Sequence, residues 1–136
     1  MKKKLVQHTT EHFKKVFQKS PEYLFLSPGR INIIGEHVDY NGGFVMPAAI
    51  NKYVCFAVSK NNDATFTLIA QDLNEAYKFD LNDNLKPVDK MWVNYILGVL
   101  HQLKSKGLAT GCNIVFSSTI PMGAGLSSSA ALECGI

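Results

Sequence analysis

The segment 27–43 constrains the fold of this 136-residue chain more than any other part of the sequence. Its apolar residues Ile31, Ile33 and Ile34 stop at Gly35, as they do in a β-strand that ends in a turn. A strand also begins before it, over 23–26, and the Ser-Pro-Gly sequence at 27–29 predicts a turn or bulge between the two. We therefore expect one interrupted strand that delivers the following residues to its end.

The residues that follow this strand are polar or ionisable: Glu36, His37, Asp39 and Tyr40. Carboxylates accept hydrogen bonds and histidine can accept or donate them, so the cluster suits a ligand with several hydroxyl groups, such as a sugar. Arg30 opens the segment with a forked guanidinium group that suits phosphate or carboxylate. The structural alternatives are an ion pair between Arg30 and these carboxylates, and a histidine that only holds the turn. A sugar site beside a phosphate site indicates a kinase.

A second segment, 121–131, reads Pro-Met-Gly-Ala-Gly-Leu-Ser-Ser-Ser-Ala-Ala. Gly123 and Gly125 allow a tight turn with inward N–H groups, and a helix expected from Leu126 directs its positive end into the same space. The segment lacks the lysine of a Walker A loop. It predicts an anion-binding loop, the alternative being a flexible strand-to-helix turn with a serine cap.

Both segments resemble motifs of a known family. The galactokinase signature is similar to Pro28-Gly29-Arg30-x-Asn32-x-Ile34-Gly35-Glu36-His37-x-Asp39-Tyr40-Asn41-Gly42-Gly43, and 121–131 resembles the phosphate loop of the GHMP small-molecule kinases, to which galactokinases belong. The resemblance implies one α/β domain over 1–136, a mixed sheet packed on helices similar to the ribosomal protein S5 domain 2-like fold. It also implies transfer of the ATP γ-phosphate to the anomeric hydroxyl of α-D-galactose, with Mg²⁺, at the start of galactose breakdown.

The resemblance also implies roles for individual residues. Arg30 would stabilise the transferred phosphoryl group, and galactose hydroxyls would be bound by Glu36, His37 and Asp39. The residues that would bind ATP and its phosphates are Gly123, Ala124, Gly125, Leu126, Ser127, Ser128 and Ser129. Ser129 aligns with the serine that reaches Mg²⁺ in the family, with Ser128 as the near competitor.

The last helix reaches Ile136 with neither a cap nor a polar tail, so we expect it to be cut. In galactokinases the aspartate that takes the hydroxyl proton and a third glycine-rich motif come from later segments. We therefore expect the N-terminal portion of a galactokinase, without the C-terminal GHMP domain, and little or no turnover by residues 1–136 alone. Asp39 is the candidate carboxylate to replace this base within 1–136, but we expect it to bind the sugar instead.

Elsewhere the local patterns predict ordinary elements. Thr9 or Thr10 is expected to cap a first helix that buries one face formed by Phe13, Val16 and Phe17. After Pro47, which is expected to close a hairpin partner at 44–46, strands are expected at 53–58, 65–69, 76–79 and 113–116. Three strands, the last of them at 65–69, are expected to form a meander. A loop is expected over 81–90.

The strongest helix pattern runs from Trp92 to Leu103, with Gly107 at the position of a C-terminal cap. Gly98 inside it suggests close packing. The aromatic stripe mainly predicts core packing, and the family resemblance offers Trp92 also as a wall for adenine.

Composition limits the class of protein: 46% hydrophobic and 18% charged residues are typical of a globular chain. The net charge of +3 equals what Lys2, Lys3 and Lys4 supply, which predicts a solvated tail and no nucleic-acid partner. Without an apolar run of about 18 residues or a signal-peptide core, we expect a cytoplasmic protein that does not bind membranes. The three cysteines lack a C-x-x-C pair, so we expect reduced core thiols.

Two rival functions remain open. One is an N-acetylgalactosamine kinase of the same fold, or less readily a mevalonate or homoserine kinase, against which the polar cluster at 36–40 argues. The other is a non-catalytic relative that binds galactose and ATP in order to recruit a partner.

Overall fold

The computed structural model describes residues 2–107, 109–121, 123 and 125–136. These residues form α-helices, β-strands and two short 3-10 helices, η1 and η2. In chain order they are α1 (Lys2–Phe17), β1 (Tyr23–Ile34), η1 (Asp39–Asn41), β2 (Met46–Lys60), β3 (Thr65–Ala70), η2 (Gln71–Leu73), β4 (Glu75–Asp80), α2 (Met91–Ser105), β5 (Cys112–Ser118) and α3 (Ser128–Gly135).

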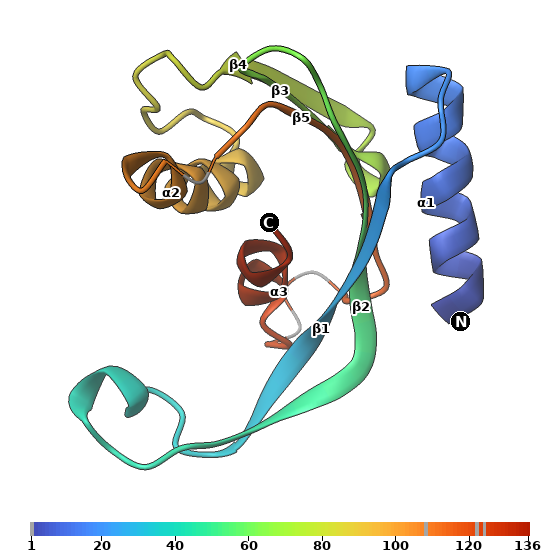
Figure 1. The fold of residues 1–136 in the computed structure, drawn as a ribbon. Helices are drawn as coiled ribbons and strands as arrows, with labels where there is room; N and C mark the ends of the chain where they lie inside the picture. The colour runs from blue at the N-terminus through green and yellow to red at the C-terminus, as the bar shows by residue number, and fades with distance from the viewer. Residues whose placement is uncertain (1, 108, 122, 124) are drawn as a thin grey trace.

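The strands form one mixed sheet in the order β1-β2-β5-β3-β4, in which β3 and β5 are parallel and the other neighbours antiparallel. Helix α1 covers one face, and α2 and α3 lie on the other (Figure 1). This confirms the expected mixed sheet packed on helices. The expected meander is wrong, because β5 lies between β2 and β3 and pairs with both.

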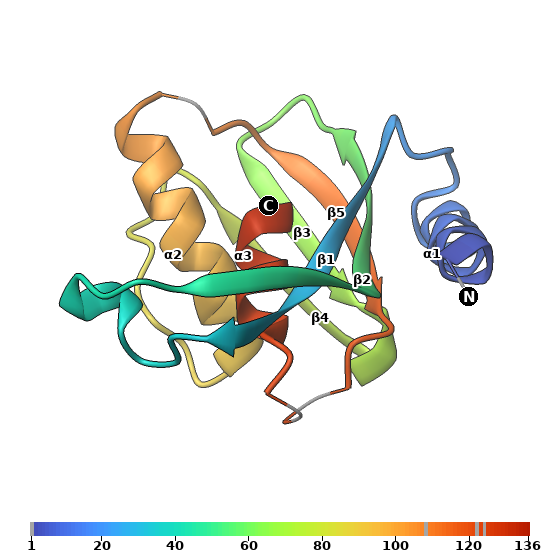
Figure 2. The same cartoon turned by 90° about the horizontal axis from the view of Figure 1, so that it is seen from below.

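Each face of the sheet has its own core. On the α1 side, Phe13 packs against Ala57 of β2 and Val115 of β5. The expected buried face of α1 is wrong for Val16, which is exposed. On the other side, a larger cluster that includes Phe56, Leu68 and Ile96 joins the sheet to α2 and α3. Seen from below, α3 lies between α2 and the β1–β2 pair (Figure 2). The larger core therefore fixes the start of α3 against the sheet.

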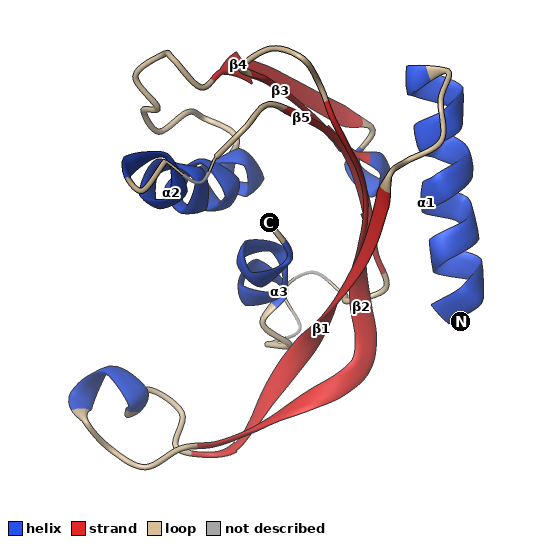
Figure 3. Cartoon of the chain, in the orientation of Figure 1, coloured by secondary structure: helices blue, strands red, loops and turns tan. Residues whose placement is uncertain are grey.

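Strands β1 and β2 continue beyond the rest of the sheet as a two-stranded arm that ends at η1 (Figure 3). The register of β1 shifts between Pro28 and Arg30, which confirms the predicted bulge. Pro47 does not close the hairpin but lies within β2. Proline is tolerated there because β5 pairs with β2 only from Val54 onward. Before Val54, β2 has a neighbouring strand on one side only, so Pro47 lies on an edge strand. Apolar side chains on this arm, such as Ile34, are exposed.

Helix α1 begins earlier than expected. Thr9 and Thr10 lie inside it and donate their hydroxyls to the carbonyls of Leu5 and Val6, four residues back. A threonine that bonds backward in this way cannot cap the helix at its own position. The lysines at 2–4 are therefore exposed on a helix, not on an irregular tail.

Helix α2 confirms the predicted pattern, and Gly107, with φ of 67°, donates its N–H to the carbonyl of Lys104 at the helix end. The idea that Gly98 permits close packing is wrong, because a Cβ there would meet no atom within 4 Å.

We expect Gly98→Ala to raise the free energy of unfolding by about 1 kcal/mol, since alanine loses less backbone freedom in a helix. Urea denaturation would measure the change. Gly42→Ala should instead lower the free energy of unfolding, because Gly42 has φ of 72°, which strains any residue with a Cβ. A destabilised Gly98→Ala variant would contradict the prediction.

The three cysteines are free. Cys55 is buried, and burial raises the pKa of its thiol and that of Cys112. The expectation of core thiols is wrong for Cys134, which is exposed on α3. Among the described residues, no helix is long and apolar enough to cross a membrane.

Candidate functional site

The glycine-rich segment makes a turn with several left-handed residues before α3. Gly123, Gly125 and Ser127 have φ of 71°, 67° and 53°. The helix begins at Ser128, two residues later than expected, because Ser127 is left-handed and the carbonyl of Leu126 is bonded outside the helix. The first N–H groups of a helix have no partners within it, so the start of α3 can receive an anion.

The carbonyl of Leu126 connects the two sequence motifs. It accepts a hydrogen bond from the backbone N–H of Arg30, at 3.2 Å. A Cβ on the buried Gly29 would lie 3.0 Å from the same carbonyl oxygen, so glycine permits this approach. The bulge in β1 therefore places the start of the Arg30 side chain beside the end of the glycine-rich turn. The side chain of Arg30 is exposed.

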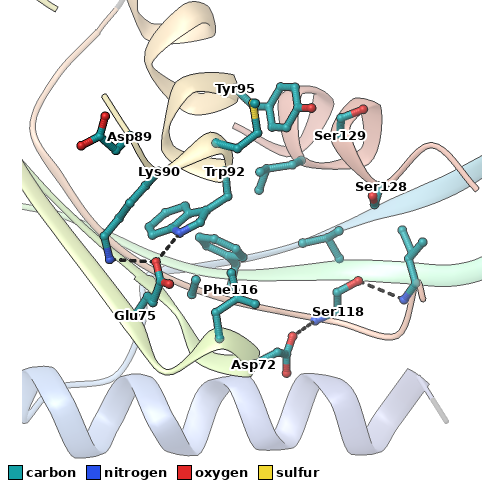
Figure 4. Close-up of a pocket in the computed structure, with 16 residues that line it drawn as sticks. Asp72, Glu75, Asp89, Lys90, Trp92, Tyr95, Phe116, Ser118, Ser128 and Ser129 are labelled. Atoms are coloured by element: carbon teal, nitrogen blue, oxygen red, sulfur yellow. Dashed lines mark hydrogen bonds and ion pairs between the residues drawn. The ribbon is translucent and has the colours of Figure 1, made fainter. Parts of the chain in front are cut away.

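A cavity of about 710 Å³ lies between the starts of α2 and α3 and the ends of β3 and β5 (Figure 4). This volume is in the range of small-molecule sites. Its aromatic lining is Trp92, Tyr95 and Phe116, and its polar lining is Asp72, Glu75, Asp89, Lys90, Ser118, Ser128 and Ser129. Trp92, which the sequence pattern placed mainly in the core, is half-buried and lines this cavity.

Trp92 is held on two sides. Its indole Nε1–H donates to Oε2 of Glu75 at 2.8 Å, and Nζ of Lys90 donates to the same oxygen, also at 2.8 Å. The ring meets Phe116 edge-on, with centroids 5.5 Å apart and an interplanar angle of 64°. The hydrogen bonds from Lys90 and Trp92 hold the pKa of the Glu75 carboxyl below its ordinary value.

A second carboxylate fixes the strand that leads into the glycine-rich turn. Asp72 in η2 accepts from the hydroxyl of Ser117 at 2.8 Å and from the backbone N–H of Ser118 at 2.6 Å. The hydroxyl of Ser118 in turn accepts from the N–H of Ile120 at 2.9 Å. Sequence reasoning missed Asp72, Glu75 and Lys90, whose partners lie 15 to 46 residues away along the chain.

We expect Asp72→Ala to lower the free energy of unfolding by about 1–3 kcal/mol. The substitution removes the acceptor of both the Ser117 hydroxyl and the Ser118 N–H, and Ser117 is only 2% exposed. Urea denaturation would measure the loss. Asp83→Ala, at an exposed loop position, is the matched control and should change stability by less than about 0.5 kcal/mol. Equal effects of the two substitutions would contradict this account.

The polar cluster of the first motif lies at the far end of the β1–β2 arm. Glu36 accepts a hydrogen bond from Nδ2 of Asn32 at 2.9 Å. His37, with φ of 61°, has its Nδ1 3.0 Å from the hydroxyl of Tyr40, and its carbonyl accepts from Asn41. These contacts order the loop from within. Both Glu36 and His37 are exposed.

The structure brings some of the predicted site residues together and leaves others apart. Trp92, Ser128 and Ser129 line one cavity, with the two serines on the far side from Glu75 and Lys90 (Figure 4). Leu126 touches the first motif through Arg30, whereas the end of the arm stands clear of α3 (Figure 1). The two motifs are thus joined by backbone contact at the base of the arm, whereas the polar cluster of the first motif lies at its tip.

Two predicted residues fall outside this comparison. Ala124 lies outside the described residues, and so does the side chain of Asp39.

Comparison with known proteins places this fold in a class. The family model for the GHMP kinases N terminal domain matches residues 94–136. The mevalonate kinase structure from Methanococcus jannaschii is 25% identical, with a TM-score of 0.64 over 83% of this chain and 37% of that one. The fold and the glycine-rich turn therefore define a GHMP kinase N-terminal domain.

A second family model, the galactokinase galactose-binding signature, matches residues 11–60. Galactokinases from Actinobacillus pleuropneumoniae serotype 5b and Haemophilus influenzae strain PittGG are 41% and 39% identical over 96% of this chain. The structure of Lactococcus lactis galactokinase complexed with galactose is 38% identical, with a TM-score of 0.82 over 93% of this chain and 34% of that one. The chain is therefore similar to galactokinases over nearly its whole length. It spans about a third of the length of these curated relatives, 34% and 35%.

Proposed function

We propose that the protein containing this chain is a galactokinase that transfers the γ-phosphate of ATP to the anomeric hydroxyl of α-D-galactose. The observation that carries this proposal is the hydrogen bond from the Arg30 N–H to the Leu126 carbonyl. It holds the segment that matches the galactose-binding signature against the segment that suits phosphate. A sugar hydroxyl and a phosphoryl group must meet in line for transfer, and this contact is where the two segments meet.

The roles proposed for the first motif follow from its chemistry. Arg30, whose backbone N–H makes this contact, would stabilise charge on the phosphoryl oxygens during transfer. Glu36, His37 and Asp39 would hold galactose through its hydroxyls, with the hydrogen bond between Asn32 and Glu36 orienting that carboxylate.

The second motif fits the polyphosphate. Positive φ values at Gly123, Gly125 and Ser127 turn the backbone before α3, and its first turn offers free N–H groups and two cavity-lining hydroxyls, of Ser128 and Ser129. Serine hydroxyls are oxygen ligands of the kind that Mg²⁺ accepts alongside phosphates. From the family resemblance we assign the metal contact to Ser129, with Ser128 as the near competitor. Mg²⁺, when bound, neutralises phosphate charge. We also propose that Trp92 faces the adenine, at the opposite side of the cavity from these serines.

The complete gene product tests this function. Incubated with ATP, Mg²⁺ and galactose, it should produce galactose 1-phosphate, detected by phosphorus NMR, and chelation of the metal should stop the reaction. A higher kcat/KM for N-acetylgalactosamine than for galactose would indicate the related kinase. Binding of galactose and ATP without transfer would indicate a sensor instead.

A further inference from the structure

We propose that Glu75, paired with Lys90, is a positioning residue that fixes the Trp92 indole as the wall against which the nucleobase stacks. The inference rests on the proposed function in that it takes ATP as the ligand of the cavity. Glu75 lies on β4, at the edge of the sheet, and both of its partners lie at the start of α2. Nothing in the motifs themselves points to Glu75.

The two sides of the cavity differ in chemistry. Ser128 and Ser129 provide hydroxyls at the start of α3, where phosphate is favoured. The other side presents the rings of Trp92 and Phe116 (Figure 4). An apolar, aromatic wall suits a flat base, which stacks on an aromatic ring without any requirement for hydrogen bonds. A nucleotide would therefore extend across the cavity, with its base on the Trp92 side.

Stacking requires a ring in a fixed orientation, and the contacts of Trp92 supply one. An indole has a single hydrogen-bond donor, and here that donor is 2.8 Å from Oε2 of Glu75. Phe116 meets the ring at 64°, which limits rotation on another side. Without Glu75, the indole N–H would have no fixed acceptor among the contacts seen here.

The ion pair between Glu75 and Lys90 contributes little to the folding stability of the protein. Their side chains are 38% and 42% exposed, and ion pairs at such positions contribute little to folding. Its consequence is local. Lys90 donates a hydrogen bond to Glu75 and favours the charged form of its carboxylate. A charged carboxylate is the stronger acceptor for the indole N–H.

The test compares binding of ADP with binding of inorganic tripolyphosphate, which has no base, to the complete gene product by calorimetry. Glu75→Ala should weaken ADP about tenfold, a typical share of one stacked base, and change tripolyphosphate less than about twofold. Glu75→Gln, which keeps an acceptor for the indole but not the charge, should fall between Glu75→Ala and the unmodified protein. The matched control is Glu11→Ala, which removes an exposed carboxylate of α1 on the opposite face of the sheet. It should change the affinity for neither ligand.

A double-mutant cycle tests whether Glu75 acts through Trp92. Phenylalanine has no N–H, so in a Trp92→Phe background Glu75→Ala should cause no further loss of ADP binding. The inference is overturned if Glu75→Ala weakens both ligands equally, if its effect persists in the Trp92→Phe background, or if it matches Glu11→Ala. It is also overturned if the unmodified protein does not bind ADP.

The readout separates this inference from the function on which it rests. Binding of ADP needs no phosphoryl transfer, so a protein that fails to phosphorylate galactose can still show the Glu75 dependence. If Glu75→Ala does not fold, Glu75→Gln and Trp92→Phe answer the same question with milder changes. Where the protein is active, kcat should stay within about twofold while the KM for ATP rises, because the base is remote from the transferred phosphoryl group.

Discussion

Arg30→Ala should lower the kcat of galactose phosphorylation by roughly 10²–10³-fold, the effect of removing one well-placed donor from a developing negative charge. Arg30 is the one arginine in the sequence. Its backbone is held at the glycine-rich turn by the bond to Leu126, so the substitution removes the guanidinium group without removing that anchor. Steady-state kinetics of the complete gene product measures the loss.

The size of the loss should depend on the shape of the side chain as well as its charge. Arg30→Lys keeps the charge but not the forked pair of donors, so its kcat should fall between those of Arg30→Ala and the unmodified protein. Lys78→Ala, an exposed cation of β4, is the control for the loss of one positive charge. If Arg30→Ala retained the kcat of Lys78→Ala, Arg30 would have no part in the transfer.

Gly35→Ala should weaken galactose binding about 10–100-fold, the equivalent of roughly 1–3 kcal/mol of backbone strain. Gly35 has φ of 93°, and a Cβ there would lie 2.6 Å from the carbonyl oxygen of Phe44 and 2.8 Å from the Cα of Val45. Both are backbone atoms of the facing segment, so the arm must open. Glu36 and His37 follow directly and would lose their positions.

Calorimetric titration of galactose would measure this loss, and the affinity for ADP should stay within about twofold, because the cavity lies at the other end of the arm. Gly42→Ala is the matched control. Gly42 is also left-handed, with φ of 72°, but a Cβ there meets no atom within 4 Å. Equal losses in the two variants would mean that left-handed strain alone, and not the closeness of the two segments, explains the effect.

Local patterns predicted the elements whose signals are local. The apolar run before Gly35, the Ser-Pro-Gly bulge and the stripe from Trp92 to Leu103 all correspond to observed structure. The strand order was not predictable in this way. β5 enters the sheet between β2 and β3 after the whole of β4 and α2, and no periodicity within a strand specifies its neighbour.

The site divides along the same line. The glycine-rich turn and the polar cluster are continuous in sequence, and their resemblance to a family identified them as motifs. Glu75 accepts a hydrogen bond from Trp92, and Asp72 accepts one from Ser118. Both partners are distant in sequence, so no local pattern distinguishes these two carboxylates from ordinary surface residues. The late start of α3 was equally hidden, because it depends on the bond between Leu126 and a strand about 100 residues earlier.

The central claim is that the two motifs form one site, joined where Arg30 meets Leu126. A crystal structure of the complete gene product with galactose and a non-hydrolysable ATP analogue tests it most directly. We expect the γ-phosphate about 2.7–2.9 Å from the Arg30 guanidinium, the base on Trp92, and galactose hydroxyls on Glu36 and His37. A nucleotide bound away from this cavity, or galactose bound away from the β1–β2 arm, would contradict the account.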